Sequence, residues 1–480
     1  MLAENKNIII ASTIFLLIFS IMQFIVPDLI GFDSYYHIKA ADIIKKEGFI
    51  KEFPWAAHTI LSNNYADIQI LFRILLIPFT FLGLSIGAKI ASVLFAALCF
   101  IVFYWFLAEN KIKYAFFWSL LYLFTAESLM YRFLLTRQMP IAIALLILTI
   151  YFLQKKKYLF LSIASFVFVL FYSGFVIQLF VTLSYFFLEK ILSKKFDYRI
   201  ILYSLSGTIL GLVISPYFPN NIFMLYTQIF KVNLISNLYN VEWKPWPFFE
   251  FIKNNILALV YLLISAFILV KNKKITKVQS LYLLLALFFF AYTILSRRMQ
   301  EYLIPFSVLA IAFLFNDYSQ RLDKNKFLKY IKIGAVVFLI ALAIINFVLL
   351  RKDVINNDFL HNYDKCAEWM KSNIPKNSLI FTNAYAFPYL FFKNSDLRYT
   401  HGIDLTYSYL YSPEEFERYM GIMQGIIKDG KDFIIQDYNP DYVFSGKIKQ
   451  DVQLYKYIVK HKENYKAAYE DDWCAVLKVK

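Results

Sequence analysis

Residues 330–353 read YIKIGAVVFLIALAIINFVLLRKD, an apolar run that ends abruptly in three charged residues. An α-helix needs about 20 consecutive apolar residues to cross the hydrocarbon core of a bilayer, so this run is typical of a transmembrane helix. Upstream of it, similar runs recur from Ile8 onward, whereas the composition from Arg351 onward is that of a soluble protein. The sequence therefore predicts a transmembrane domain over residues 1–350 and a small soluble α/β domain over residues 351–480.

The composition of the whole chain supports a membrane protein. Hydrophobic residues make up 59% of the 480 residues and aromatic residues 20%, whereas soluble domains are about 45–50% apolar. We expect an all-α polytopic bundle of about 11–13 transmembrane helices. The apolar segments lie near residues 8–26, 67–83, 88–107, 114–130, 138–153, 158–172, 174–188, 200–217, 252–270, 278–295, 301–315 and 330–350.

The net charge of +16 is concentrated in short lysine runs between the apolar segments. A basic protein raises the question of nucleic-acid binding. Lysines confined to connections between spans are instead typical of cytoplasmic loops, which the positive-inside rule enriches in Lys and Arg. We therefore expect a multi-pass protein of the cell membrane that binds no nucleic acid. The lysine runs are Lys111/Lys113, 155–157, 190–195, 271–277 and 324–332.

Loop charge also predicts the orientation. With the lysine runs inside, the connections 27–66, 131–137 and 218–251 and the C-terminal domain lie outside, provided that segment 67–83 does not cross the membrane. That segment would be an interfacial or re-entrant helix, and eleven crossings remain. An alternative with the same count lets 67–83 cross and treats 158–188, which is short for two crossings, as one span. The alternative places five lysines outside.

The tail carries the signals of a small α/β unit. Ser412-Pro413-Glu414-Glu415 has the sequence of a helix N-terminal capping box, and we expect the helix that follows to end at Gly430. Cys366 and Cys474 both fall in the tail and could form a disulfide. Short runs of β-forming residues predict strands at residues 378–382, 433–436, 442–445 and 475–479.

The first long external connection, 27–66, contains GFDSYYHIKAADIIKKEG at residues 31–48. From Ser34 onward the apolar residues recur with helical periodicity, which predicts a helix that starts near Asp33. Residue type alone favours the interpretation that Asp33 is the N-cap of that helix.

In this topology, the ionisable residues of the external connections all lie at the same face of the membrane. Several convergent ionisable groups at one membrane face indicate a binding or catalytic site. They include Asp33, Arg132, Arg137, Glu242, Arg297 and Arg298.

The run Asp33-Ser34-Tyr35-Tyr36-His37, at the end of the first span, resembles the first acidic motif of oligosaccharyltransferase catalytic subunits and of the wider GT-C class of membrane glycosyltransferases. These enzymes take sugar from a polyprenyl-phosphate or polyprenyl-diphosphate carrier, and an aspartate of their first external loop is catalytic or binds a metal. The resemblance implies that role for Asp33. It also implies that Tyr36, His37 and Arg137 bind the substrate or its phosphate.

Two later stretches resemble motifs of the same class. NVEWKP at residues 240–245 resembles a short glutamate motif, which implies a catalytic role for Glu242; otherwise Glu242 is a loop residue beside interfacial tryptophans. RRMQEYLIP at residues 297–305 resembles the start of a late span, where an arginine contacts the carrier phosphate. Arg297 or Arg298 would pair bidentately with phosphate oxygens. Otherwise the two are arginines at a span end that reach toward water.

The tail both resembles and departs from that class. Residues 369–382, at the start of the tail, and Gly402-Ile403-Asp404 are similar to it. Oligosaccharyltransferases, however, continue with a Trp-Trp-Asp-Tyr-Gly motif that reads the acceptor sequon, where this chain has NAYAF at residues 383–387. The difference argues against the same mode of peptide recognition.

The class also has a second acidic pair in an early external loop. The matching residues 131–140 contain no acid, and Glu127, in the apolar run upstream, is the candidate substitute. Hard cations take several oxygen ligands. The corresponding hypothesis is a divalent cation, Mg²⁺ or Mn²⁺, held by Asp33, Glu127 and the carrier phosphate.

The sequence thus predicts a membrane glycosyltransferase that transfers a sugar or oligosaccharide from a polyprenyl (dolichyl)-phosphate-linked donor to an extracytoplasmic acceptor, a protein or a lipid-linked glycan. Asp33 would act as base or, with a cation, position the acceptor. Its partners would be the lipid-linked donor, the acceptor and the bilayer. The alternative is a non-catalytic transporter or assembly factor for lipid-linked glycans, which the missing acidic pair and tryptophan motif favour.

Overall fold

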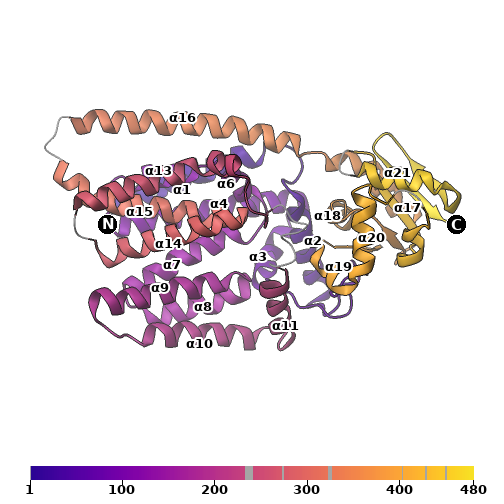
Figure 1. Ribbon diagram of the computed structural model, residues 1–480, viewed down its shortest axis with the longest axis horizontal. Coiled ribbons are helices and arrows are strands. Elements are labelled where there is room, and N and C mark those ends of the chain that lie inside the picture. The colour runs from indigo at the N-terminus through magenta and orange to yellow at the C-terminus, as the bar shows by residue number, and fades with distance from the viewer. Residues whose placement is uncertain are drawn as a thin grey trace.

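The computed structural model describes residues 2–232, 242–272, 275–322, 327–402, 404–427, 430–448 and 451–480. A bundle of roughly aligned helices forms most of the molecule, and the C-terminal domain packs against one end of it (Figure 1). The N-terminus lies at the opposite end of the bundle, so the long axis of the molecule runs from the N-terminus to the C-terminal domain.

Seven of the described helices are long and apolar enough to cross a membrane on their own. Three further helices of the bundle, α7 (Met139–Gln154), α8 (Tyr158–Phe171) and α10 (Arg199–Ile214), are shorter. The chain is thus a multi-pass membrane protein, while the count of eleven crossings stays a prediction. The seven helices are α1 (Leu2–Gln23), α4 (Leu84–Glu109), α9 (Phe175–Ser193), α13 (Phe248–Asn272), α14 (Lys277–Leu295), α15 (Gln300–Leu322) with the preceding 3-10 turn η2 (Arg297–Met299), and α16 (Phe327–Asn356).

Two features bear on the alternative topologies. Helix α3 (Ile70–Thr80) has 11 residues, which span only about 16 Å at 1.5 Å per residue, against about 30 Å of hydrocarbon. Residues 158–188 form two helices, α8 and α9, separated by a short break around Ser173. Both features agree with the topology in which segment 67–83 does not cross.

The predicted continuous span 114–130 is wrong. The chain instead forms α5 (Ala115–Leu123) and α6 (Glu127–Leu134), separated by an extended residue at Ala126. Helix α6 then makes an angle of 105° with α7. The break has a physical reason, because an ionisable side chain is costly in the middle of an apolar span, and the break places Glu127 at the first residue of α6 instead.

The first external connection joins the bundle to the C-terminal domain. It contains α2 (Phe32–Glu47), which packs against α18 (Phe387–Lys393). Beyond α2, the backbone N–H of His58 donates to the carbonyl of Thr400 at 2.9 Å, and the indole of Trp55 donates to the carbonyl of Ser395 at 2.6 Å. Farther along the chain, α11 (Asn220–Tyr226) and the π-helix η1 (Thr227–Val232) lie at the same end of the bundle (Figure 1).

The C-terminal domain is built on a five-stranded mixed sheet of order β2-β1-β3-β5-β4. β1 pairs parallel with β2 and β3, and β5 pairs antiparallel with β3 and β4. The strands are β1 (Leu379–Phe381), β2 (Arg398–Tyr399), β3 (Tyr442–Gly446), β4 (Tyr465–Glu470) and β5 (Cys474–Val479). The other elements are η3 (Leu360–Tyr363), α17 (Asp364–Asn373), α19 (Thr406–Tyr411), α20 (Pro413–Met423), η4 (Ile434–Tyr438), α21 (Val452–Lys460) and η5 (Lys462–Asn464).

Three of the four predicted strands are confirmed as β1, β3 and β5, and the fourth, 433–436, is wrong. That segment is the π-helix η4. The backbone N–H of its first residue, Ile434, donates to Oδ1 of Asp432 at 3.1 Å. Ile434 is buried in the domain core, so its apolar character follows from packing rather than from strand formation. β2 and β4 were not predicted.

Helix α20 begins as predicted and ends earlier. The Ser412 hydroxyl accepts from the Glu415 N–H at 3.4 Å, so half of the capping box is present. The predicted end at Gly430 is wrong, because Gly425 takes a positive φ of 69° and the N–H of Ile426 donates back to Gly421, which is a helix-ending geometry.

A disulfide links Cys366 of α17 to Cys474 of β5, which settles the open pairing. The predicted boundary at residue 351 stays an interpretation, since α16 continues to Asn356.

Candidate active site

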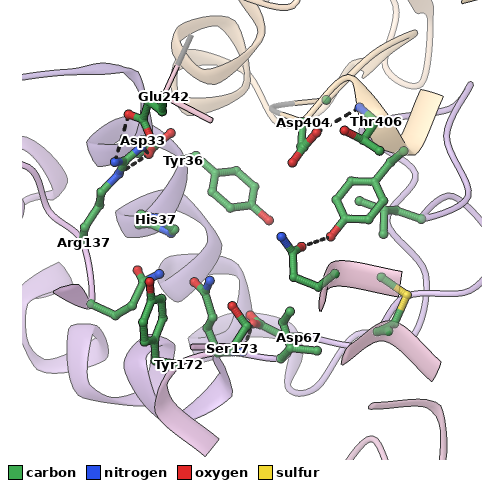
Figure 2. A pocket seen from close by; sticks show the side chains of 18 of the residues that line it. Asp33, Tyr36, His37, Asp67, Arg137, Tyr172, Ser173, Glu242, Asp404 and Thr406 are labelled. Carbon is green, nitrogen blue, oxygen red and sulfur yellow. Dashed lines mark hydrogen bonds and ion pairs between the residues drawn. The ribbon is translucent and has the colours of Figure 1, made fainter. Parts of the chain in front are cut away.

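A cavity of about 830 Å³ lies where the C-terminal domain meets the end of the helix bundle (Figure 2). Its walls come from α2, the connection before α3, the turn before α7, the break between α8 and α9, η2 and residues 384–407 of the tail. A concave pocket with a few convergent polar groups is the general form of a ligand site. Most predicted site residues line it: Asp33, Tyr36, His37, Arg137, Glu242 and Arg298.

Asp33 is the second residue of α2, and its side chain does not cap the helix. The N-cap position is Gly31, whose φ of 72° is a conformation that glycine adopts readily. The Ser34 hydroxyl donates to the carbonyl of Ile30 at 2.6 Å and accepts from the N–H of Thr136 at 2.9 Å, which ties the start of α2 to the turn before α7. The N-cap interpretation is therefore wrong, and the Asp33 carboxylate faces the cavity instead.

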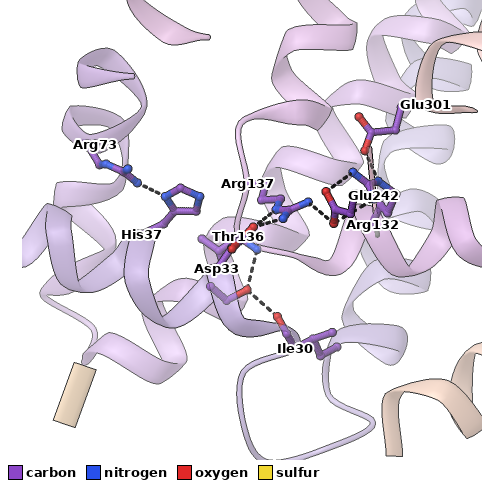
Figure 3. A network of polar contacts seen from close by, with 10 residues as sticks. Ile30, Asp33, His37, Arg73, Arg132, Thr136, Arg137, Glu242 and Glu301 are labelled. Carbon is purple, nitrogen blue, oxygen red and sulfur yellow. Dashed lines mark hydrogen bonds and ion pairs between the residues drawn. The ribbon is translucent and has the colours of Figure 1, made fainter. Parts of the chain in front are cut away.

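Two arginines and three acids form one ion-pair network at this wall (Figure 3). Arg137 binds the carboxylate of Asp33 and, at 3.3 Å, that of Glu242. Arg132 binds Glu242 at 3.2 Å and also Glu301. Burial acts to raise the pKa of Glu242, but Arg132 and Arg137 outweigh it and hold the pKa well below its ordinary range. Glu242 therefore stays ionised, and each carboxylate restrains an arginine.

A second buried ion pair, between Asp67 and Arg73, lies on another wall. Arg73 Nε donates to Asp67 Oδ2 at 3.0 Å, contacts His37 Nδ1, and stacks 5.0 Å from the ring centre of Tyr36. Asp67 and Arg73 line the cavity but were not predicted to belong to the site. The signal was present, because ionisable residues within an apolar segment are costly unless they are paired. The six-residue spacing of Asp67 and Arg73 did not reveal the pair, because Asp67 lies before helix α3 and Arg73 lies within it.

Arg297 and Arg298 are adjacent in η2 but point in different directions. Arg298 stacks 5.0 Å from the ring centre of Trp243 and lines the cavity. Arg297 stacks 4.8 Å from Trp246, lies 3.7 Å from the Glu250 carboxylate, and does not line the cavity. Among the residues that the structure describes, no carboxylate forms an ion pair with Arg298. Of the two, only Arg298 lines the cavity.

Glu127 is separate from this site. It is the first residue of α6, its nearest described ionisable neighbour is Asp353 of α16, and it does not line the cavity. The structure therefore does not bring together Asp33 and Glu127, the two predicted metal ligands.

The C-terminal domain supplies an acid to which the sequence assigned no role. Asp404 lines the cavity and faces Asp33, Arg137 and Glu242 from the opposite side (Figure 2). The signal for it was the resemblance of Gly402-Ile403-Asp404, although Ile403 lies outside the described residues. Three walls of the cavity are thus polar and come from segments far apart in the chain.

A multi-pass bundle with a polar cavity beneath a C-terminal domain is the arrangement of the GT-C class, and solved structures bear out that this chain has the GT-C fold. At the level of sequence, no protein-family model and no curated protein matches. The fold similarity extends over nearly the whole chain, at low sequence identity.

Two membrane enzymes illustrate the similarity. The oligosaccharyltransferase AglB of Archaeoglobus fulgidus, tethered with an acceptor peptide containing the NVT sequon, has a TM-score of 0.63 at 11% identity, covering 98% of this chain and 74% of that one. The same enzyme with an inhibitory peptide and dolichol-phosphate has a TM-score of 0.61 at 12% identity, covering 95% and 72%. ArnT of Cupriavidus metallidurans bound to undecaprenyl phosphate has a TM-score of 0.59 at 11% identity, covering 98% of both chains.

The residues around Asp33 do not fit a hard divalent cation in this arrangement. A structure of the Archaeoglobus fulgidus enzyme contains Zn and sulfate. Here, the carboxylates of Asp33 and Glu242 are both bound to the guanidinium of Arg137, whereas Mg²⁺ and Mn²⁺ require several oxygen ligands for themselves. Within the described part of the chain, the clusters of three potential ligands lie elsewhere, one of them at the disulfide. The positive charge beside Asp33 is therefore the guanidinium of Arg137, at the position where a divalent cation was expected.

Proposed function

We propose that this chain is a membrane glycosyltransferase that transfers a sugar or oligosaccharide from a polyprenyl (dolichyl)-phosphate-linked donor to an extracytoplasmic acceptor, a protein or a lipid-linked glycan. The observation that carries the proposal is the convergence of Asp33, Arg137, Glu242 and Arg298 on one cavity in a bundle with the GT-C fold. Cleavage of a glycosyl–phosphate bond develops negative charge on the phosphate and positive charge on the sugar. Fixed charges of both signs can stabilise such a transition state.

The donor phosphate binds Arg298 with support from Arg137. A guanidinium presents a planar fork of N–H donors that matches phosphate oxygens and never loses its charge. Stacking on Trp243 holds the Arg298 side chain, and Asp33 and Glu242 hold that of Arg137. The site is thus arranged before the donor arrives, which lowers the cost of ordering these side chains on binding.

Asp33 and Glu242 act as fixed negative charges rather than as bases. A proton added to either carboxylate would break its pair with Arg137, so neither is well suited to receive the proton of the acceptor. Their carboxylates instead orient Arg137 and favour the partial positive charge that the sugar ring acquires as the bond to phosphate lengthens. This revises the predicted role of Asp33 as base.

The carrier chain leaves the cavity beside α9. The wall on the bundle side consists of residues 172–174, Val176 and Ile177, together with Tyr292 of α14. Val176 is 41% exposed. An isoprenoid chain is apolar, so contact with this wall or with lipid removes its surface from water, which is favourable. Its phosphate stays in the polar cavity.

The connection between α9 and α10, which carries the lysine run 190–195, lies at the end of the bundle away from the C-terminal domain (Figure 1). Glu189, which directly precedes the run 190–195, pairs with Lys156 at 3.3 Å and with Lys277 at 3.5 Å. These pairs bring the runs 155–157, 190–195 and 271–277 close to one another. The N–H of Lys113 donates to Asn316 near the end of α15, at 2.9 Å. By the positive-inside rule this end is cytoplasmic, and the cavity and the C-terminal domain face the extracytoplasmic side, as the first topology predicts.

Chelation should leave transfer unaffected, because the arginines supply the positive charge. The measurement compares initial rates in EDTA with rates in added Mg²⁺ or Mn²⁺, and Mn²⁺ binding to the purified protein is followed by electron paramagnetic resonance. A rate that falls to background in EDTA and returns with Mn²⁺ would contradict the role given to Arg137.

The proposed function is tested with the gene deleted in its own organism. Donor lipid extracted from the deletion strain, labelled in its sugar, is supplied to membranes of that strain together with the purified protein. Sugar transfer to a membrane acceptor with release of polyprenyl phosphate is the expected result. An intact donor, together with lipid-linked glycan that accumulates on the cytoplasmic face, would instead support a transporter.

A further inference from the structure

Asp404 differs from the other carboxylates of the cavity in its partners. Asp33 and Glu242 are bound to Arg137, and Asp67 is bound to Arg73. Asp404 forms no ion pair within the described residues. Its Oδ1 accepts from the backbone N–H of Thr406 at 2.9 Å, at the start of α19. It is thus the one described cavity-lining carboxylate that can change protonation state without breaking an ion pair.

A structural role accounts for only part of the Asp404 side chain. The bond to Thr406 forms a local turn that leads into α19, which Asp side chains do in many loops. That bond uses one carboxylate oxygen, and an Asn side chain would make it equally well. The side chain nevertheless lies in the cavity, opposite to the arginine wall, where a substrate would contact it (Figure 2).

The surroundings of Asp404 favour a proton acceptor. Burial raises its pKa above the ordinary aspartate value, against the lowering effect of Thr406 and Arg298. The other ionisable groups that act on it are Asp33 from α2 and Tyr407 of α19. A carboxylate with a raised pKa accepts a proton more readily than one fixed in an ion pair, and catalytic bases are tuned in this direction.

We propose that Asp404 is the general base of the transfer reaction and binds a hydroxyl group of the acceptor. This inference rests on the proposed function. The acceptor oxygen forms a bond to the anomeric carbon, and its proton passes to Asp404. The bond between the anomeric carbon and the phosphate oxygen breaks, and its electron pair stays on the phosphate, held by Arg298 and Arg137. The C-terminal domain thereby supplies a catalytic residue to a donor site built by the bundle.

The test compares Asp404→Asn, Asp404→Glu and the wild type in the transfer assay described above. Asp404→Asn keeps the bond to Thr406 but cannot take a proton, so its kcat should fall about 10²- to 10⁴-fold, the usual contribution of a general base. Its KM for the donor lipid and its binding of dolichyl phosphate should not change. Asp404→Glu should recover part of the rate. Asp472→Asn, an exposed aspartate of the same domain, is the control and should match the wild type.

The pH profile separates a base from a structural residue. A base acts when deprotonated, so the wild-type kcat should rise with pH through the pKa of Asp404, and Asp404→Asn should lose this limb. A wild-type kcat and pH profile in Asp404→Asn would overturn the role of Asp404 while leaving the proposed function intact. A raised KM for the donor with unchanged kcat would also overturn it. No transfer by the wild type would overturn the proposed function itself.

Discussion

Arg298→Ala should lower the rate of sugar transfer by about 10²- to 10³-fold, the cost typical of removing one fixed donor from a developing negative charge. The reason is specific to this side chain. Among the described residues it forms no ion pair with a carboxylate, and it stacks on Trp243 and lines the cavity. Arg298→Lys should recover little, because an ammonium cannot form the bidentate contact with phosphate. The measurements are the initial rate of transfer and the affinity for dolichyl phosphate.

Arg297→Ala is the matched control for this prediction. Arg297 precedes Arg298 in η2 and also stacks on a tryptophan, but it lies near Glu250 and outside the cavity. We expect Arg297→Ala to keep wild-type transfer and wild-type affinity. Equal losses in the two variants would mean that the arginines act through the fold of η2 rather than through the phosphate.

Asp33→Asn should reduce transfer by at least about 100-fold while membrane insertion stays intact. The substitution removes the negative charge that binds Arg137 and leaves Glu242 as the carboxylate paired with this half-buried guanidinium. Arg137 is then free to move toward Glu242, and the donor phosphate loses an aligned partner. The measurement is the rate of transfer with the labelled donor lipid, accompanied by the amount of protein in the membrane fraction.

Asp28→Asn provides the control in the same connection. Asp28 lies five residues upstream, pairs with His361 at 3.4 Å, and does not line the cavity. A double variant, Asp33→Asn with Arg137→Gln, distinguishes catalysis from stability. Residues in one ion-pair network are not additive, so the double variant should regain thermal stability relative to either single variant and remain inactive. Full activity in Asp33→Asn would remove Asp33 from the site.

The resemblance to the GT-C class pointed to individual residues that line the cavity, but not to the contacts between them. Asp33, Glu242 and Arg298 each follow from a local motif, and the cavity contains all three. The partners of these residues could not be read in the same way. Arg137 lies 104 residues from Asp33 and 105 from Glu242, and no local pattern relates positions so far apart. The pairing therefore appeared only when α2, the turn before α7 and the segment after residue 241 were seen together.

The membrane bundle and the helix that carries Asp33 could both be predicted from the sequence. These follow from the length of apolar runs and from helical periodicity, which are properties of neighbouring residues. Three features became visible only in the folded chain: Arg137 lies beside Asp33, Arg298 rather than Arg297 lines the cavity, and Asp404 lines it from the C-terminal domain. The physical reason is that ion pairs and cavities depend on distances between segments, and packing sets those distances.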